Sequence, residues 1–325
     1  MHSVILNQPL YGYAMDLLEE KTNLYVAHSN NAMEFLDKLQ EADAIIVRNC
    51  RIDRNILELC PRLKVLTLPG VGYQDWDLQA LTEHGVAMAY CPGTNERSVA
   101  EHTIAMLYAL AKNIPERNNE VKAGNYGIRN KFNAVELAGR TVGVLGLGNI
   151  GKQVARLLIN NDMQVRVFDP YVSREVADAA GCIYHEDLME MLPYCDALTF
   201  HVPLLPQNVG MFGARQLAAM KEGAYLINCA RGSLVDESAL YDALASGHLG
   251  GAALDVMVQE PFDASHPLFT LPNVIASPHV AGVTKEASSR TYGLAASSTL
   301  ALLDGEHISN VANPDVFRHK KWQTK

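Results

Sequence analysis

The stretch from Thr141 to Ala155 constrains this chain more than any other. A β-rich apolar run, 141–145, enters a glycine turn with the pattern G-x-G-x-x-G, and a helix-periodic segment leaves it. A strand, a turn and a helix in this order are typical of dinucleotide binding. We expect Gly146 to make the tight turn, Gly148 to let backbone N–H groups approach a pyrophosphate, and Gly151 to let helix and strand pack closely. The positive end of the helix then faces the phosphates.

An acidic residue follows the next predicted strand. Strand 164–168 ends at Asp169, about 20 residues beyond the turn, where a carboxylate meets the ribose 2′-OH of NAD. Because the same carboxylate repels the 2′-phosphate of NADP, we predict NAD as the cofactor, although Arg174 lies nearby. The alternative is an ordinary glycine-rich βα turn, and the coincidence of strand, helix and acid argues against it.

Composition narrows the class of protein. A length of 325 residues allows about two domains, and 48% apolar with 19% charged residues is ordinary for a globular protein. The net charge of −9 argues against a nucleic-acid partner. A basic cluster, Arg318–Lys321 with Lys325, is predicted to be a solvated tail.

No segment indicates a membrane, a secretory leader or a metal. The first residues lack a basic region followed by an apolar one, and no apolar run approaches the ~18 residues of a membrane span. The six cysteines have no metal-ligand spacing. We therefore predict a cytoplasmic protein with small buried cysteines, no metal and no membrane partner.

Strand-like and helix-like segments alternate along the whole chain, which predicts parallel sheets covered on both faces. Helical stretches are expected at Ala32–Leu39, Ile52–Leu59, Ser98–Lys112 and Thr284–Leu303. The predicted strands are Ser3–Leu6, Leu24–Ala27, Ala44–Val47, Val65–Leu68, Val86–Ala89, 141–145, 164–168, 197–200, 225–228, 251–254 and 273–277.

The predicted fold class is α/β, with two Rossmann/flavodoxin-like doubly wound parallel-sheet domains and an active-site cleft between them. The last long helix is expected to cross back onto the first domain and make it discontinuous. This gives a substrate-binding domain of residues 1–98 and 286–325 and an NAD-binding Rossmann domain of residues 99–285. The stretch 115–137 lacks periodicity and is interpreted as an excursion that clasps another subunit. The resemblance described below implies the homodimer.

Three ionisable residues follow strands of the second domain, where parallel strands share one edge. Arg231 follows strand 225–228, Glu260 follows strand 251–254 and its loop, and His279 follows strand 273–277. The set suits hydride transfer onto a 2-keto acid: His279 protonates the carbonyl oxygen, Glu260 orients the ring and favours imidazolium, and Arg231 holds a carboxylate. Each residue alone also fits an ordinary structural role.

Other residues are assigned with less chemistry behind them. The backbone amides of Val71 and Gly72 are expected to form a nest for the substrate carboxylate. His102, His201 and His266 lack such a partner pattern, although the segment from His201 to Pro203 is expected to wall the cofactor pocket.

These motifs together resemble the D-isomer-specific 2-hydroxyacid dehydrogenases over nearly the whole chain. The resemblance rests on 146–151, on 228–236, on 251–256 with Glu260-Pro261, on 277–282, and on the segment beginning at Ser98. It implies a two-domain NAD enzyme, usually a dimer, with His279 as acid/base, Glu260 as its partner and Arg231 as substrate anchor. The cofactor contacts it implies, with those expected above, are Gly146, Gly148, Asn149, Ile150, Gly151, Asp169, Val202, Pro203, Cys229, Ala230, Arg231, Asp255, His279 and Gly282.

The substrate remains open within this family. The segment 46–48, the run from Cys229 and the pair Arg129/Lys131 are similar to 3-phosphoglycerate dehydrogenases, and hydroxypyruvate or glyoxylate reductases are also similar. Glu260 argues against the formate branch, which usually carries Gln there. The loop 68–76 departs from the usual Ala-Gly-x-Gly-x-Asp-Asn run, so phosphoglycerate, hydroxypyruvate, glyoxylate and other polar 2-keto acids are all retained.

Two further hypotheses follow. Arg48, with Arg51, Arg129 and Lys131, marks either a phosphorylated or sulfonated substrate or only scattered solvated charges. A regulatory NAD(H)-sensing binding protein of corepressor type is the rival function. The lack of basic clusters other than the one at Arg318–Lys321, and of disordered tails that bind partners, argues against it.

Overall fold

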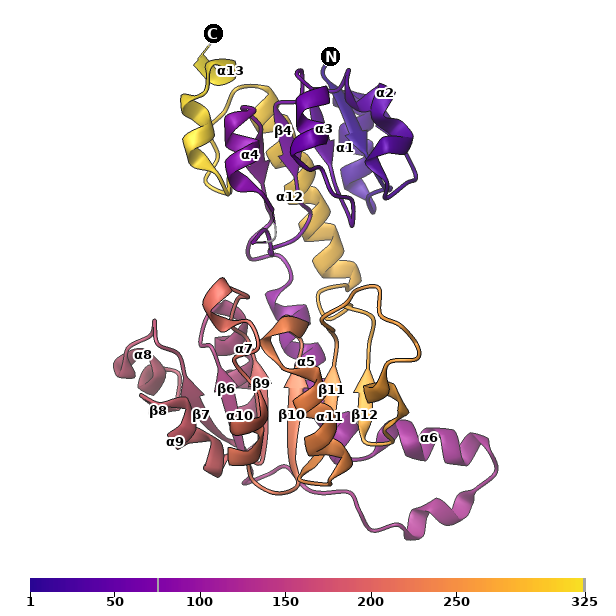
Figure 1. The fold of residues 1–325 in the computed structure, drawn as a ribbon, viewed down its shortest axis with the longest axis vertical. Coiled ribbons are helices and arrows are strands. Elements are labelled where there is room, and N and C mark those ends of the chain that lie inside the picture. Colours follow the sequence, from indigo (N-terminus) through magenta and orange to yellow (C-terminus); the bar gives the residue numbers. More distant parts are fainter. Residues whose placement is uncertain (75, 324–325) are drawn as a thin grey trace. The chain divides into compact units, whose positions relative to one another are not determined.

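The computed structural model describes residues 1–74 and 76–323 (Figure 1). The chain forms two compact units: one comprises residues 1–95 together with those from Val283 onward, and the other comprises Glu96–Gly282. Asp75 of the predicted substrate loop and Lys325 of the predicted tail lie outside the described residues.

The first unit is built on one parallel sheet. Its strand order is β2-β1-β3-β4-β5, counted over the described residues, which is the flavodoxin-like order 2-1-3-4-5. The strands are β1 Ser3–Leu6, β2 Asn23–Val26, β3 Ala44–Ile46, β4 Val65–Thr67 and β5 Ala87–Ala89. The helices are α1 Tyr13–Lys21, α2 Leu36–Leu39, α3 Arg54–Leu59, α4 Leu78–Glu83, α12 Lys285–Leu303 and α13 Lys320–Gln323, with 3-10 turns at Ala32–Phe35 and Pro314–Arg318.

Strand periodicity explains how both faces of this sheet are covered. Ile45 and Leu66 pack with α2, α3 and α4 in one apolar cluster, whereas their neighbours Ala44 and Val65 pack with α12 on the other face. Within that second face the hydroxyl groups of Thr67 and Thr299 hydrogen-bond at 2.7 Å. Helix α12 begins where predicted because Thr284 caps it, accepting from the Ala287 N–H at 3.1 Å.

The second unit has a larger parallel sheet. Across residues 96–282, all of which are described, the order is β12-β11-β10-β9-β6-β7-β8. The strands are β6 Thr141–Leu145, β7 Gln164–Phe168, β8 Ile183–His185, β9 Ala197–Phe200, β10 Ala224–Asn228, β11 Leu249–Leu254 and β12 Val274–Ala276. The helices are α5 Glu96–Ala111, α6 Ile114–Lys122, α7 Asn149–Ile159, α8 Arg174–Ala179, α9 Leu188–Met191, α10 Ala214–Ala219 and α11 Glu237–Ala245. Turns of 3-10 helix lie at Tyr126–Asn130, Leu192–Tyr194, Pro206–Asn208, Gly232–Leu234 and Pro267–Thr270.

Helices cover both faces of this sheet as well (Figure 1). Val142 and Val144 belong to a cluster with α5 and α7, and the next residue, Leu145, belongs to a cluster with α9, α10 and α11. From β6 the order runs outward through β7 and β8 on one side and through β9 to β12 on the other, which is the Rossmann arrangement with an added strand. The point where the order reverses lies between β6 and β9.

The predicted fold class, two doubly wound parallel sheets, is confirmed. Most predicted strands agree with the observed ones to within two residues. Strand β8, which is three residues long, was not expected. The predicted helix Ala32–Leu39 is a 3-10 turn followed by a single α-turn, and α3 begins only at Arg54 because Asp53 caps it.

The prediction of a solvated C-terminal tail is wrong for Lys321 and for the neighbouring Trp322, whereas Lys320 is exposed as expected. Lys321 Nζ donates to the Leu63 carbonyl at 3.0 Å, and Trp322 Nε1 donates to the Gly85 carbonyl at 3.0 Å. Burial, and then the charges of Lys64 and Lys320, hold the pKa of Lys321 below its ordinary value. This segment therefore packs on the first unit.

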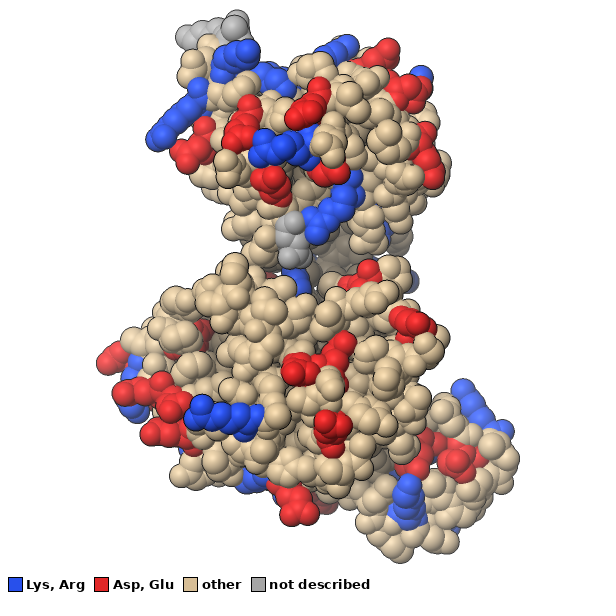
Figure 2. Space-filling view, in the orientation of Figure 1, with Lys and Arg blue, Asp and Glu red and all other residues tan. Residues whose placement is uncertain are grey.

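Surface charge is mixed in both units. On the face shown in Figure 2, Lys and Arg side chains are interspersed with Asp and Glu. Within the described part of the chain, no helix has the length and apolar character needed to cross a membrane.

Candidate active site

The glycine turn joins β6 to α7 at the point where the strand order reverses. Gly146 has a φ of 95°, which L-residues avoid, and a Cβ there would lie 2.8 Å from the His201 carbonyl oxygen. A Cβ on Gly151 would lie 2.0 Å from the Gly146 carbonyl oxygen. Both glycines are therefore required by the packing of the turn itself.

Gly148 differs from its two neighbours because a Cβ there would meet nothing within 4 Å. It is the N-cap of α7, and no side chain caps the helix. The first backbone N–H groups of a helix have no intrahelical partner. The start of α7 thus presents free donors and partial positive charge at the carboxyl edge of the sheet, which is a site suited to phosphate. Asn149 is exposed here, with its amide donating to Glu96 at 2.7 Å, and Ile150 is half-buried.

Asp169 follows β7 and lies directly against the turn. Its Oδ2 accepts from the Leu147 N–H at 2.8 Å and its Oδ1 accepts from the Tyr171 N–H at 2.9 Å. The side chain therefore holds the backbone of the glycine turn. A carboxylate oxygen has two lone pairs, so these bonds leave acceptor capacity for a ribose hydroxyl.

The segment after β9 forms the opposite side of the turn. The His201 N–H donates to the Leu145 carbonyl at 2.7 Å, and its Nε2 is 3.0 Å from Thr199 Oγ1. Burial lowers the pKa of His201 to about 3, so the ring is neutral at physiological pH. Val202 touches the position of a Cβ on Gly146, and Pro203 is exposed beside it.

Arg231 lies in a tight loop after β10. The buried Asn228 accepts from the Ala230 N–H at 3.0 Å and donates to the Arg231 carbonyl at 2.9 Å. Gly232 permits the next contact, because a Cβ there would lie 2.0 Å from the Met257 carbonyl carbon. The loop that carries Arg231 is thus packed against the loop that leads to Glu260.

Glu260 and His279 form a direct pair. Glu260 Oε2 is 2.7 Å from His279 Nδ1, and Oε1 accepts from the Met257 N–H at 3.2 Å. Burial raises the pKa of Glu260, but the His279 hydrogen bond and charge, with help from the Arg231 charge, hold that pKa below its ordinary value. The three residues predicted from strand ends therefore lie near one another.

His279 adopts a left-handed backbone conformation, with φ of 52°. Such a conformation is uncommon for a residue other than glycine, and the surrounding structure must hold it. The His279 N–H donates to the Asp255 carbonyl at 2.8 Å, and its side chain is 48% exposed. The opposite ring nitrogen, Nε2, is thus available for a substrate.

Asp255 is fully buried, and its side chain points into the protein. Oδ1 accepts from Ser277 Oγ at 2.6 Å and from the Val280 N–H at 2.9 Å, and Oδ2 accepts from the Ala281 N–H at 2.8 Å. Its carboxylate therefore fixes the loop that carries His279. The cofactor contact of Asp255 that the resemblance implies stays a prediction, as do those of Gly282 and Cys229. Burial raises the pKa of the Cys229 thiol to about 12.

Two histidines set aside in the sequence do have acidic partners. His102 Nε2 lies 3.0 Å from Ser277 Oγ and 3.6 Å from Asp255 Oδ1. His266 Nε2 lies 3.2 Å from Glu237 Oε2. The expectation that these residues lack partners is wrong.

The predicted substrate residues lie at the carboxyl edge of the sheet in the first unit. Arg48 follows β3, and the loop with Val71 and Gly72 follows the adjacent strand β4. The fully buried Asn7 fixes the backbone of Arg48 by accepting from its N–H at 2.6 Å and donating to its carbonyl at 2.8 Å. The Arg48 guanidinium lies 5.3 Å from the centre of the Tyr292 ring.

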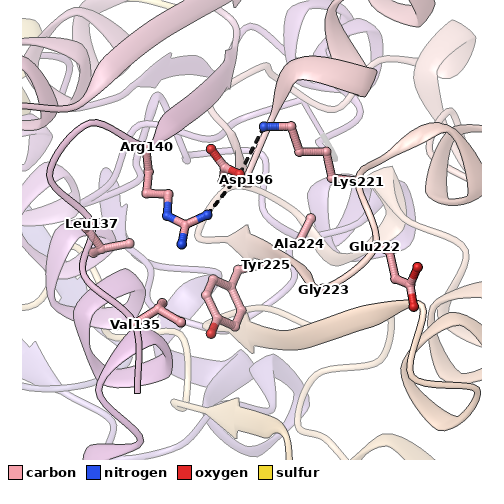
Figure 3. Close-up of a pocket in the computed structure, with 9 residues that line it drawn as sticks. All are labelled: Val135, Leu137, Arg140, Asp196, Lys221, Glu222, Gly223, Ala224 and Tyr225. Atoms are coloured by element: carbon pink, nitrogen blue, oxygen red, sulfur yellow. Dashed lines mark hydrogen bonds and ion pairs between the residues drawn. The ribbon is translucent and has the colours of Figure 1, made fainter. Parts of the chain in front are cut away.

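A small cavity of about 80 Å³ lies at the opposite edge of the second sheet (Figure 3). Asp196 sits in it, between Arg140 at 3.6 Å and Lys221 at 2.9 Å, and also accepts from the Thr141 N–H at 2.8 Å. Burial opposes ionisation, but the Thr141 and Lys221 bonds hold the pKa of Asp196 below its ordinary value. These groups neutralise one another at the start of β6 and β9, so we assign them to stability.

The groups around the glycine turn suit an organic cofactor. The free helix start, the open space at Gly148 and the buried carboxylate of Asp169 fit a dinucleotide with its pyrophosphate and ribose. Over the described residues, no group of three or more His, Cys, Asp or Glu side chains is arranged to hold a metal ion.

A doubly wound sheet with such a turn at the reversal of strand order defines a dinucleotide-binding protein. Residues 104–281 match the family model described as D-isomer specific 2-hydroxyacid dehydrogenase, NAD binding domain. The chain belongs to the D-isomer-specific 2-hydroxyacid dehydrogenase family, as its motifs predicted. The predicted cofactor, NAD, is the one that this domain description names.

Individual relatives support the assignment. The chain is 38% identical over 327 residues to D-3-phosphoglycerate dehydrogenase of Methanocaldococcus jannaschii, an alignment covering 100% of this chain and 62% of that protein. The chain thus spans less than two thirds of that relative's length. It is also similar to the crystal structure of the TT0316 protein from Thermus thermophilus, with 31% identity, a TM-score of 0.83 and coverage of 95% and 99%. D-lactate dehydrogenase from Escherichia coli gives 26% identity, a TM-score of 0.86 and coverage of 96% and 100%.

Proposed function

We propose that the chain interconverts a D-2-hydroxy acid and its 2-keto acid, with NAD(H) as the hydride carrier. The observation that carries the proposal is the pair of Glu260 and His279 at 2.7 Å, with Arg231 close enough to lower the pKa of Glu260. A histidine with a carboxylate partner beside a fixed guanidinium is suited to proton transfer on an anionic substrate.

Each side chain has one task in this proposal. When bound, the nicotinamide supplies or accepts the hydride at the substrate's C2. In reduction, His279 donates a proton from Nε2 to the carbonyl oxygen, and in oxidation it takes the hydroxyl proton. Glu260 holds Nδ1–H, which fixes the ring and stabilises the charged form of His279. Arg231 binds the substrate carboxylate with its planar fork of donors.

We propose a phosphorylated 2-hydroxy acid as the first substrate to test. The M. jannaschii relative is named a D-3-phosphoglycerate dehydrogenase, and Arg48 stands beside the loop of Val71 and Gly72 in the first unit. Arg48→Ala should raise KM for phosphorylated substrates selectively. Equal effects on phosphorylated and unphosphorylated substrates would remove Arg48 from phosphate recognition.

The general test is a panel of purified 2-keto acids with NADH. Phosphorylated, hydroxylated and aliphatic members are mixed with the protein, and absorbance at the NADH band is followed. Oxidation of NADH by at least one member, with a D-configured product, is the expected result. NADH binding without turnover across the panel would contradict the proposal and favour the regulatory alternative.

We also propose that the second unit pairs with a second copy of the chain. Helix α6 has no buried residue, and the segment after it projects from the unit (Figure 1). Its apolar side chains are exposed, with Val121 at 57%, Tyr126 at 70% and Phe132 at 94%. We call α6 and the residues that follow it, 114–132, the arm. Exposed aromatic groups on this arm indicate an interface. Light scattering should report a dimer, and a monomer for Val121→Ser/Phe132→Ser.

The matched control for the arm is Tyr13→Ser. Tyr13 is 68% exposed but belongs to the first unit rather than to the arm. This variant should remain dimeric, and a wild-type monomer would contradict the dimer proposal. A cytoplasmic location is the last part of the proposal. It is supported by the six cysteines, all of which are free and buried.

A further inference from the structure

A chain of three side chains lies beneath the loop that carries His279. His102, on α5, has a side chain that is 25% exposed, with Nε2 3.0 Å from Ser277 Oγ. Ser277 Oγ in turn lies 2.6 Å from Oδ1 of the fully buried Asp255. The sequence separates His102 from Ser277 by 175 residues.

The direction of these hydrogen bonds follows from the number of protons. A serine hydroxyl carries one hydrogen, and an ionised carboxylate accepts only. Ser277 must therefore donate to Asp255, which leaves its oxygen as an acceptor for His102. His102 is thus protonated on Nε2, and the order of donation runs from His102 to Ser277 to Asp255.

The last member of this chain determines the backbone around His279. The Asp255 carboxylate accepts from the N–H groups of Val280 and Ala281, and its main-chain carbonyl accepts from the His279 N–H at 2.8 Å. A buried carboxylate is stable only when such donors surround it. The same donors hold His279 in its left-handed conformation, because they fix the peptide groups that follow it.

We infer that His102 is a positioning residue for His279, acting through Ser277 and Asp255. The inference rests on the proposed function, in which His279 transfers the proton. His102 fixes the Ser277 hydroxyl, Ser277 gives its hydrogen bond to Asp255, and Asp255 then holds the loop so that the His279 ring meets Glu260. His102 itself touches none of the reacting atoms.

The kinetic test compares two replacements of His102. His102→Leu removes the Nε2 donor, and His102→Gln restores an N–H at a similar distance along the side chain. We expect the leucine variant to lose about tenfold in kcat, as for a lost hydrogen bond in a charged network, with its NADH Kd unchanged. The glutamine variant should recover to within about twofold. An unchanged kcat in the leucine variant, or a glutamine variant as slow as leucine, would overturn the inference.

A double-mutant cycle separates positioning from general loosening of the fold. Ser277→Ala breaks the same chain, so His102→Leu/Ser277→Ala should be no slower than the slower single variant. Losses that multiply would mean that the two residues act independently, which contradicts the inference. His248→Leu is the matched control: His248 Nε2 bonds the Leu217 carbonyl at 3.0 Å, at the opposite end of the sheet, and kcat should not change.

A spectroscopic readout keeps this inference separate from the proposed function. Nitrogen-15 NMR of the histidine rings at alkaline pH should show His102 protonated at Nε2, with the signal assigned by its loss in His102→Gln. If no 2-keto acid is reduced by the wild type, the proposed function fails while this measurement still tests the hydrogen-bonded chain. A His102 ring protonated at Nδ1 alone would overturn the inference directly.

Discussion

Gly148→Ser separates the two requirements of the glycine turn, because it should affect stability and cofactor binding in opposite directions. Gly148 has φ −71° and ψ −162°, a conformation that serine adopts readily at an N-cap, and an added Cβ meets nothing within 4 Å. Serine is a better N-cap than glycine by a few tenths of a kcal/mol. The free energy of unfolding should therefore stay the same or rise by up to about 0.5 kcal/mol.

The same serine should weaken NADH binding. Its hydroxyl bonds the N–H groups at the start of α7 that a pyrophosphate needs, and its side chain fills the space beside them. Loss of even one hydrogen bond to a charged group costs about 1.5–3 kcal/mol, which corresponds to about 10- to 100-fold in Kd. The assays are NADH fluorescence titration and thermal unfolding of the same preparation.

Gly151→Ala is the matched control with the reverse pattern in stability. Its Cβ would lie 2.0 Å from the Gly146 carbonyl oxygen, so backbone must move. Overpacking costs about 1–3 kcal/mol, and the better helix propensity of alanine offsets about 0.5–1 of it. The difference of these two ranges is about 0–2.5 kcal/mol, and because the clash is with backbone we expect a net loss near its upper end, about 1.5–2.5 kcal/mol. NADH binding by Gly148→Ser at wild-type affinity would refute the placement of the pyrophosphate, and a fully stable Gly151→Ala would refute the packing argument.

Three further predictions concern stability, the thiols and cofactor choice. The pKa of Asp196 is lowered in the folded state, so the stabilisation by its carboxylate is present above the ordinary aspartate pKa and is lost as the pH falls through the folded-state pKa. Asp196→Asn should therefore lower the free energy of unfolding by about 1–2 kcal/mol near neutral pH. In unfolding titrations at acidic pH, the difference between the variant and the wild type should vanish. The six cysteines are buried, and burial raises the pKa of their thiols to about 11 or 12. A disulfide reagent at pH 8 should therefore leave these thiols unmodified until the protein is denatured. Rapid reaction of the native protein would contradict their burial. Asp169 should favour NADH over NADPH in kcat/KM, since Arg174 is engaged with Glu186 at 3.4 Å; equal values with both cofactors would disprove this.

The parts of the fold and of the site that could be predicted are those in which the sequence has a regular pattern. Strand β6, the glycine turn and α7 are readable because an apolar run, fixed glycine spacing and helical periodicity adjoin one another. Arg231, Glu260 and His279 could be brought together without a structure because the carboxyl ends of parallel strands share an edge. The hydrogen bond between Glu260 and His279 could be predicted from this topology alone.

The remaining features depend on contacts between distant segments. The bond of His102 to Ser277 joins a residue on α5 to a residue just after β12, and nothing in either segment signals it. The approach of Gly232 to Met257 is likewise invisible, since a glycine after a strand also fits a simple turn. Trp322 and Lys321 looked like part of a polar tail, but their bonds to Gly85 and Leu63 are tertiary.

The most direct test of the account is the turnover of His279→Ala with NADH and the best 2-keto acid of the panel. The account predicts that kcat falls about 10²- to 10⁴-fold, the range that general acid catalysis contributes, while the Kd of NADH changes little. The kcat of Glu260→Gln should also fall, but by less, because this variant keeps the His279 ring and removes only the carboxylate that pairs with it. An unchanged kcat in His279→Ala would contradict the claim that His279 transfers the proton.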